Sequence, residues 1–183
     1  MKQFLIFLLV MLAFSCGQPA ATTENTTANS NAADGGQSTV QDDVSQQDVV
    51  HIAVGSPDHT TLVTALKTAE YVDVLSNVGP FTVFAPTNAA FDKLPAGTVE
   101  GLLKPESKDA LRNILEYHVY VGVLTETMIR DGMKLNQVNL DDVVLNKKDG
   151  KITVNGANVL GSARGSNGIV YIIDSVLLPP AKK

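Results

Sequence analysis

The chain has 183 residues, a formal net charge of −5 and 44 % hydrophobic residues, which is enough apolar material for one domain with a buried core. Residues 17–47 hold four acidic side chains and no Lys or Arg, whereas the chain from Asp48 onward carries 13 basic and 15 acidic residues. This near-neutral balance gives no support for nucleic-acid binding, which needs a clustered basic face. One cysteine, with three histidines that lack zinc-type spacing, excludes an internal disulfide and a Cys-based metal site, and no cofactor is expected.

Residues 1–15 are predicted to be a signal peptide. Lys2 precedes an uninterrupted apolar run over residues 4–14, which is too short to span a bilayer but typical of a secretory signal. The small residues around Cys16 resemble a bacterial lipobox, although the usual Leu three places before the cysteine is absent. This resemblance implies cleavage before Cys16 and acylation of its thiol, so that the membrane is a partner through the lipid.

The alternative is ordinary secretion, with cleavage near Ser15 and a free thiol at Cys16. A free exposed thiol is a liability in an oxidising compartment, which favours acylation. Two or three acyl chains give stable attachment to a membrane. Gly17 follows the cysteine where Asp signals inner-membrane retention in some bacteria, so the outer membrane or cell surface is expected instead.

Residues 16–47 are predicted to be the lipidated cysteine and a disordered linker. The stretch after Cys16 is rich in Thr, Asn, Ala, Gln, Ser and Gly and contains no aromatic residue, Leu or Ile. Such a composition cannot bury enough apolar surface to offset the entropy of ordering. The folded domain is therefore placed at residues 48–180.

The first half of that domain reads as helices around one strand. Ser56-Pro57 is a typical helix start, in which the Ser56 hydroxyl is predicted to cap the helix and Pro57 to lie in its first turn. Residues 81–84 form a strand pattern after the Gly79-Pro80 break. Thr87 is predicted to cap a short helix through Phe91, and Thr98 to cap another through Leu103.

The second half begins with helical patterns and ends in strands. Apolar residues at helical spacing predict a helix over 105–119, and a short helix is expected over 125–130. Asp149-Gly150 and Asn155-Gly156 are strong hairpin-turn signals. Residues 169–173 form a continuous apolar run that suits a strand buried on both faces. This order predicts an α+β fold in which helices pack on one side of a β wedge.

Three separated motifs resemble the signatures of fasciclin domains: residues 79–91, the Tyr117-His118 pair, and residues 167–179. The resemblance implies a fasciclin-like β wedge with several helices and a non-catalytic role in adhesion to an unknown surface protein or matrix component. It also marks family motif positions, which we expect to be structural: Thr82, Phe84, Pro86, Thr87, Asn88, Phe91, Tyr117, His118, Gly168 and Asp174. In animal members an Asp-Ile pair is linked to integrin recognition; Ser162-Ala163 stand there in this chain, so that mechanism is not expected.

His118 has two interpretations. Its helical position places it on the apolar face with Leu111 and Leu115, which favours a buried, neutral and hydrogen-bonded imidazole. A nucleophilic triad of Ser175, His118 and Asp174 is disfavoured, because neighbouring residues on a strand point to opposite faces.

Three functions remain open after this comparison. The first is an envelope adhesion or protein-binding module. The alternative is an envelope receptor for a small molecule or glycan, for which no aromatic platform is visible because the chain has no Trp. The least favoured is an envelope hydrolase, which requires a polar pocket at His118.

Overall fold

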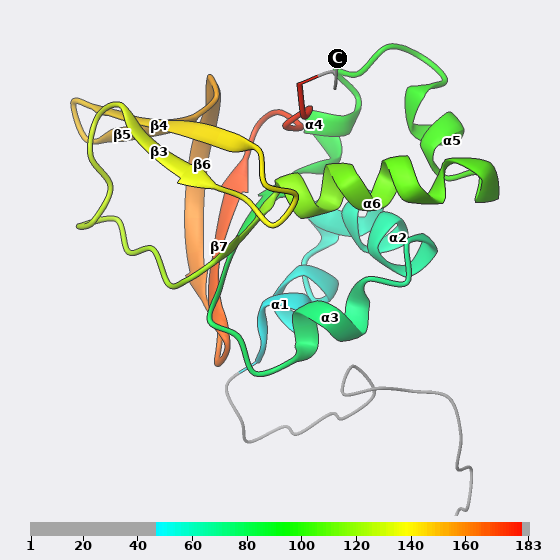
Figure 1. The fold of residues 1–183 in the computed structure, drawn as a ribbon, viewed down its shortest axis with the longest axis horizontal. Helices are drawn as coiled ribbons and strands as arrows, with labels where there is room; N and C mark the ends of the chain where they lie inside the picture. Colours follow the sequence, from blue (N-terminus) through cyan, green and yellow to red (C-terminus); the bar gives the residue numbers. More distant parts are fainter. Residues whose placement is uncertain (1–46, 181–183) are drawn as a thin grey trace, which may run out of the picture. The chain divides into compact units, whose positions relative to one another are not determined.

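The computed structural model describes residues 47–180 (Figure 1). The predicted signal peptide, Cys16 and nearly all of the predicted linker lie outside the described residues. Within residues 47–180, none of the helices has the length and apolar character needed to cross a membrane.

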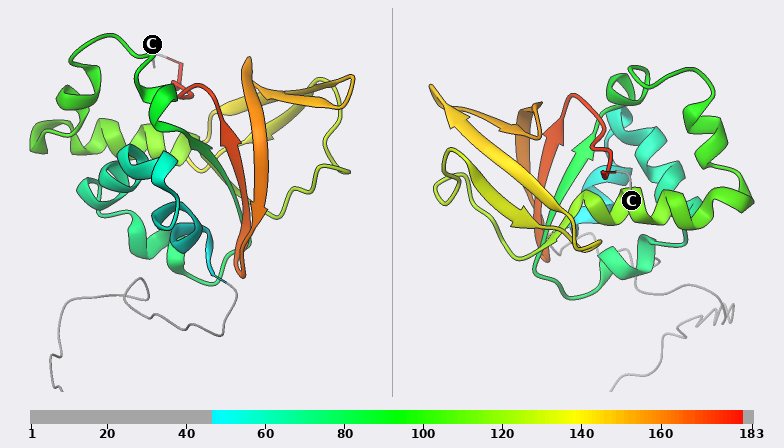
Figure 2. Two further views of the ribbon diagram at one scale, coloured as in Figure 1. Left: turned by 180° about the vertical axis from the view of Figure 1, so that it is seen from behind. Right: turned by 45° about the horizontal axis from the view of Figure 1, so that its top comes forward.

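The helical layer contains six short α-helices and two 3-10 turns in the described part of the chain. They are α1 (Val49–Val54), η2 (Pro57–His59), α2 (Thr60–Thr68), α3 (Val72–Ser76), α4 (Asn88–Phe91), α5 (Thr98–Leu102), η3 (Pro105–Ser107) and α6 (Lys108–Tyr117). Figure 2 shows these helices gathered on one side of the sheet, as the sequence predicted.

The sheet has seven strands in the order β2-β1-β7-β6-β5-β4-β3. They are β1 (Phe81–Pro86), β2 (Val119–Val121), β3 (Met133–Asn136), β4 (Asp142–Lys148), β5 (Lys151–Val154), β6 (Ala157–Arg164) and β7 (Gly168–Ile173). The pair β1–β7 is parallel and the other pairs are antiparallel. This mixed sheet with one helical layer confirms the predicted α+β wedge.

Two hydrophobic cores lie on the two faces of the central strands. On β1, Val83 and Ala85 face the core beneath the helices, whereas Phe84 faces the second core between the strands. On β7, Val170 faces the first core and Tyr171 the second. Side chains alternate between the faces of a strand, so a strand with a core on each side is apolar throughout. The prediction that residues 169–173 are buried on both faces is thereby confirmed.

Both predicted hairpin turns are present. Asp149 and Gly150 have φ angles of 50° and 77°, and Asn155 and Gly156 have φ angles of 47° and 87°. Two successive positive φ values define the type I′ turn, which Asn-Gly and Asp-Gly favour because the backbone twist matches that of the strands.

Two helix predictions need correction. Residues 125–130 form a turn instead of a helix: the carbonyl of Glu126 accepts a hydrogen bond from Lys147 Nζ at 2.7 Å, and Ile129 is buried in the second core. The helix predicted over residues 105–119 starts as the 3-10 turn η3 and ends at Tyr117. It ends there because the His118 carbonyl accepts a bond from the β1 residue Phe84 at 2.9 Å.

The two predicted caps at Ser56 and Thr98 also differ from the structure. Gly97, at φ 84°, precedes α5 and Thr98 is its first residue, with no side-chain cap. Ser56 makes no capping hydrogen bond either; its hydroxyl instead bonds the Nδ1 atom of His59 at 2.8 Å.

The N-terminal end of the described region is attached to the turn between β6 and β7. The Ser166 N–H donates to the Gln47 carbonyl at 3.0 Å, and the Val49 N–H donates to Asn167 Oδ1 at 2.9 Å. Gln47, one residue before the predicted boundary at Asp48, thus already contacts the domain.

We expect a chain that begins at Gln47 to unfold at the same temperature as the full mature chain. Residues 17–46 lack the side chains that build a core, so their removal forfeits little buried apolar surface. Thermal unfolding followed by circular dichroism measures both midpoints. A midpoint lower by several degrees in the shortened chain would mean that the preceding residues pack on the domain.

Candidate functional site

Thr82 holds the segment that follows β2. Its buried hydroxyl donates to the Gly122 carbonyl at 2.6 Å and accepts from the Leu124 N–H at 3.0 Å. The Leu124 carbonyl in turn accepts from the Tyr171 hydroxyl at 2.8 Å. The N–H and the carbonyl of Leu124 are thus both hydrogen-bonded, one to a side chain of β1 and the other to a side chain of β7, as buried backbone groups require.

Thr87 and Asn88 are capping residues, but of two different helices. The Thr87 hydroxyl accepts from the Ala90 N–H at 3.3 Å and caps its own helix α4, which confirms the predicted cap. Asn88 Oδ1 accepts from the Thr61 N–H at 3.0 Å in the first turn of α2, and its Nδ2 donates to the Pro57 carbonyl at 3.0 Å. Asn88 therefore joins α4 to the start of α2.

The apolar motif residues Phe84, Pro86 and Phe91 pack in the interior or beside it. Phe84 is fully buried and stacks on Tyr171 with ring centroids 6.0 Å apart. Pro86 is also among the most buried side chains, while Phe91 is partly buried against the first core. Phe84 and Pro86 are therefore closed to any ligand.

Tyr117 connects the end of α6 to the β4–β5–β6 hairpins. Its hydroxyl donates to the Asp142 carbonyl at 3.0 Å and accepts from Asn155 Nδ2 at 2.8 Å. Burial raises the pKa of Tyr117, while the hydrogen bond from Asn155 acts in the opposite direction. The phenol therefore stays protonated, which its donor role at Asp142 requires.

His118 is a buried, neutral side chain, as its position in the sequence predicted. Its Nε2 atom accepts from the Leu177 N–H at 3.0 Å, so the proton sits on Nδ1 and is donated to the Ile114 carbonyl at 2.7 Å. Burial lowers the pKa of His118 to about 4, and the bond to Ile114 opposes that shift only in part. With both nitrogens bonded to backbone, the ring has no free position for a proton transfer or a metal.

Asp174 fastens the end of β7 to β6. Its two carboxylate oxygens accept from the backbone N–H and the side-chain Nδ2 of Asn158, each at 2.8 Å. The side-chain bond from Asn158 is the main cause that holds the pKa of Asp174 below its ordinary value. The Asp174 carbonyl also accepts from Lys93 Nζ at 2.7 Å.

The reason given above against a triad is wrong in one respect. Ser175 lies beyond the end of β7, and its hydroxyl donates to Asp174 Oδ1 at 3.2 Å, so the two side chains do meet. His118 is not joined to this pair, because its Nε2 atom is occupied by the Leu177 N–H. The structure therefore lacks the base–nucleophile contact on which a triad depends.

A hollow lies among α2, α5 and α6, but its wall is almost entirely apolar. Its lining includes Leu62, Phe91, Leu102 and Leu111, and His118 forms one edge. The imidazole contributes no free polar atom there, since both nitrogens bond to backbone. The hollow thus has no polar groups arranged to bind a glycan or to activate water. Among residues 47–180 no three His, Cys, Asp or Glu side chains cluster as a metal site does.

Asn167 is the connecting residue that sequence reasoning did not single out. Its Nδ2 donates to the carbonyls of Leu75 at 2.7 Å and Asn77 at 2.9 Å, and its Oδ1 accepts from the Val49 N–H. It thereby ties α1 and α3 to the start of β7. The Asn-Gly pair before the apolar run marked a turn, but no local signal identified three distant partners. The motif residues thus make hydrogen bonds and packing contacts that hold the helices and strands of the domain together.

Comparison with known proteins shows the family to which this chain belongs. The family model described as the fasciclin domain matches residues 57–179. Protein sll1483 of Synechocystis sp. is 47 % identical over 133 residues, which cover 72 % of this chain and 73 % of that protein. The cell surface glycolipoprotein MPB83 of Mycobacterium bovis is 40 % identical over 144 residues, covering 76 % of this chain and 64 % of that protein.

The fold has a counterpart among solved structures. The FAS1 domain pair from the insect cell adhesion molecule Fasciclin I superposes with a TM-score of 0.65 at 20 % identity. The match covers 74 % of this chain and 52 % of that chain. At this identity the likeness concerns the fold.

Proposed function

We propose, because this chain belongs to the fasciclin domain family, that it is a lipid-anchored binding module of the cell envelope. Proteins of this family are adhesion-type, non-enzymatic modules of the cell surface. The finer proposal is that this domain binds a surface protein or matrix component, without catalysis, while a lipid on Cys16 holds it at the outer membrane or cell surface.

The observation that carries this proposal is that the signature residues direct their hydrogen bonds into the domain. The polar side-chain groups of Thr82, Asn88, Tyr117, His118 and Asp174 bond to atoms of the domain itself. Groups committed in this way build a rigid scaffold, and a partner must then be recognised by surface residues outside the signatures.

The anchor is tested by Cys16→Ala. We expect this substitution to abolish the incorporation of labelled fatty acid and to leave the unprocessed precursor, because the thiol is the acyl acceptor and lies at the cleavage site. Metabolic labelling and the electrophoretic mobility of the chain measure both effects. Labelled fatty acid in the Cys16→Ala protein would contradict the anchor.

Adhesion is tested on cells with and without the chain. We expect cells that carry it to attach more firmly to a matrix-coated surface, and the soluble domain to compete with that attachment. Equal attachment of both kinds of cell would contradict the adhesion role.

A receptor for a small apolar molecule is the second candidate, which the apolar hollow beside α5 favours over a glycan receptor.

A further inference from the structure

Three uncharged stretches of the chain meet at one end of the sheet. Residues 74–91, 117–125 and 165–173 contain no Asp, Glu, Lys or Arg. The Phe81 N–H donates to the Asn167 carbonyl at 3.0 Å, which joins the first stretch to the third. The Gly122 N–H donates to the Pro80 carbonyl at 2.9 Å, which joins the first to the second. Figure 1 shows the α3–β1 loop and the β6–β7 turn at this same end.

This end exposes four apolar side chains, Val78, Pro80, Val121 and Val123, which together we call the uncharged end. Val78 is 91 % exposed and Val121 is 62 % exposed; Pro80 and Val123 are exposed as well. Single exposed apolar residues are ordinary, but a group of them without charges is typical of a surface that is covered in use.

Gln47, the first residue that the structure describes, lies at this end of the domain. The Gln47 carbonyl accepts the Ser166 N–H in the β6–β7 turn, so the residues that lead back to Cys16 depart from beside the uncharged end. If residues 17–47 form the flexible linker that their composition predicts, they would span on the order of 30 Å. An anchor on Cys16 therefore keeps this end of the domain within reach of the bilayer.

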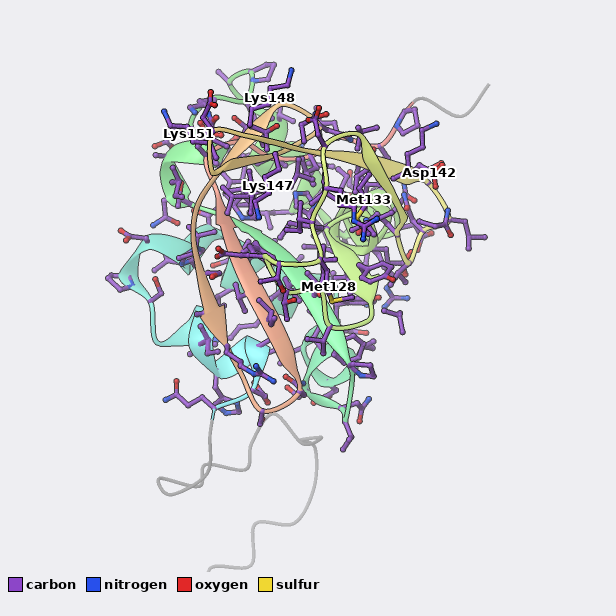
Figure 3. The ribbon with its side chains drawn as sticks, turned by 90° about the vertical axis from the view of Figure 1, so that its left-hand side faces the viewer. Met128, Met133, Asp142, Lys147, Lys148 and Lys151 are labelled. Carbon is purple, nitrogen blue, oxygen red and sulfur yellow. The ribbon has the colours of Figure 1, made fainter. Side chains whose placement is uncertain are left out.

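The β4–β5 hairpin is the opposite in character. Lys147, Lys148, Asp149 and Lys151 cluster at its tip, and Figure 3 shows the three lysines at the end of the domain away from the β6–β7 turn. Lys148 and Lys151 are direct cross-strand neighbours. Pressing this tip against lipid chains would remove several lysines from water, which is costly. The four apolar side chains of the uncharged end carry no such cost, and the exposed Arg164 just before the β6–β7 turn has a side chain long enough to reach the lipid headgroups.

We propose that the uncharged end rests on the lipid bilayer that carries the anchor, so that the β3–β4–β5 end faces outward to a partner. This inference rests on the proposed lipid anchor. Because the anchor holds the domain beside the bilayer, the uncharged end can contact lipid even if this contact is too weak to bind an unanchored domain to the membrane. A second copy of the chain is a poorer occupant, because a stable protein interface buries about 1,000 Å² or more with good complementarity, and four side chains do not provide that.

The test measures how close two positions lie to lipid. The full lipidated chain is prepared as Val78→Cys and, separately, as Lys148→Cys; with Cys16 acylated, the new cysteine is the one reactive thiol. Each is labelled with a bimane fluorophore and bound to phosphatidylcholine vesicles containing headgroup-spin-labelled lipid. We expect at least twofold stronger quenching at position 78 than at position 148.

A matched pair of further variants tests the patch itself. Val121→Asp, made in the Val78→Cys chain, should lower the quenching to the value at position 148, whereas Leu160→Asp should leave it unchanged. Both Val121 and Leu160 are 62 % exposed, but Leu160 lies on β6 outside the uncharged end, so the two variants expose the fold to a similar perturbation.

The outcomes separate the two proposals. Vesicle-bound protein with equal quenching at positions 78 and 148 would overturn the bilayer contact and leave the anchor intact. Protein that does not float with the vesicles would overturn the anchor and, with it, this contact. If position 78 shows no quenching and the protein forms a dimer in detergent that Val121→Asp dissociates, the uncharged end binds a second copy of the chain instead.

Discussion

Gly168→Ala is expected to destabilise the domain by about 3 kcal/mol or more, the upper part of the range for forced overpacking. Gly168 is the first residue of β7 and pairs with Phe81 of the parallel neighbour β1. A Cβ atom at this position would overlap the carbonyl oxygen of Phe81, and the Phe81 backbone nitrogen and carbonyl carbon are also too close. Because these are backbone atoms of a central strand, relief requires the β1–β7 pairing to separate. Urea unfolding followed by circular dichroism measures the loss.

Gly101→Ala provides the control for this substitution. Gly101 lies inside α5, and a Cβ atom there meets no other heavy atom within 4 Å. Alanine in a helix interior is favoured over glycine by about 0.5–1 kcal/mol, so this variant should be at least as stable as the unmodified protein. If Gly168→Ala proved equally stable, the close approach of β1 and β7 at Gly168 would be ruled out.

His118→Ala is expected to cost about 2–4 kcal/mol, the sum of a cavity and an orphaned polar group. The ring fills space between α6 and the segment after β7, and its removal leaves the Leu177 N–H without its acceptor. The core variant Leu115→Ala should be destabilised by a similar amount through a cavity alone. Urea unfolding gives the stability of each variant, and surface attachment gives its binding.

These two measurements separate a structural histidine from a binding one. If His118 is structural, both variants should lose binding only in proportion to their unfolded fraction. A His118→Ala protein that is as stable as the unmodified chain but does not bind would place His118 at a functional surface. The receptor and hydrolase hypotheses would then have to be reopened.

The same histidine should contribute to the loss of stability in acid. Its pKa is about 4 in the folded protein and 6.5 without the protein environment. Between these values the unfolded chain binds a proton that the folded chain does not, so the stabilisation is complete above pH 6.5 and is lost as the pH falls to 4. The difference corresponds to about 3 kcal/mol. His118→Ala should therefore lose less stability than the unmodified protein between pH 6.5 and 4.

Several features were determined by the sequence alone, because neighbouring residues decide them. The type I′ turns at Asp149-Gly150 and Asn155-Gly156 depend on residues that tolerate positive φ, and the Thr87 cap depends on an N–H three residues away. The apolar run that forms β7 required a core on each face. The three motifs also identified the fasciclin family correctly. For the turns and the cap, the physical cause acts within a few residues of the signal.

The tertiary structure decided the features whose partners lie far along the chain. Residues 125–130 do not form the predicted helix; their partners are Lys147, which bonds the Glu126 carbonyl, and the second core, in which Ile129 is buried. Asn88 caps α2 instead of its own helix, and Asn167 bonds to residues about 90 positions earlier. The uncharged end likewise exists only once β1, β2 and the β6–β7 turn are hydrogen-bonded together. A hydrogen bond needs its two atoms about 3 Å apart, and only the fold brings such distant residues to that distance.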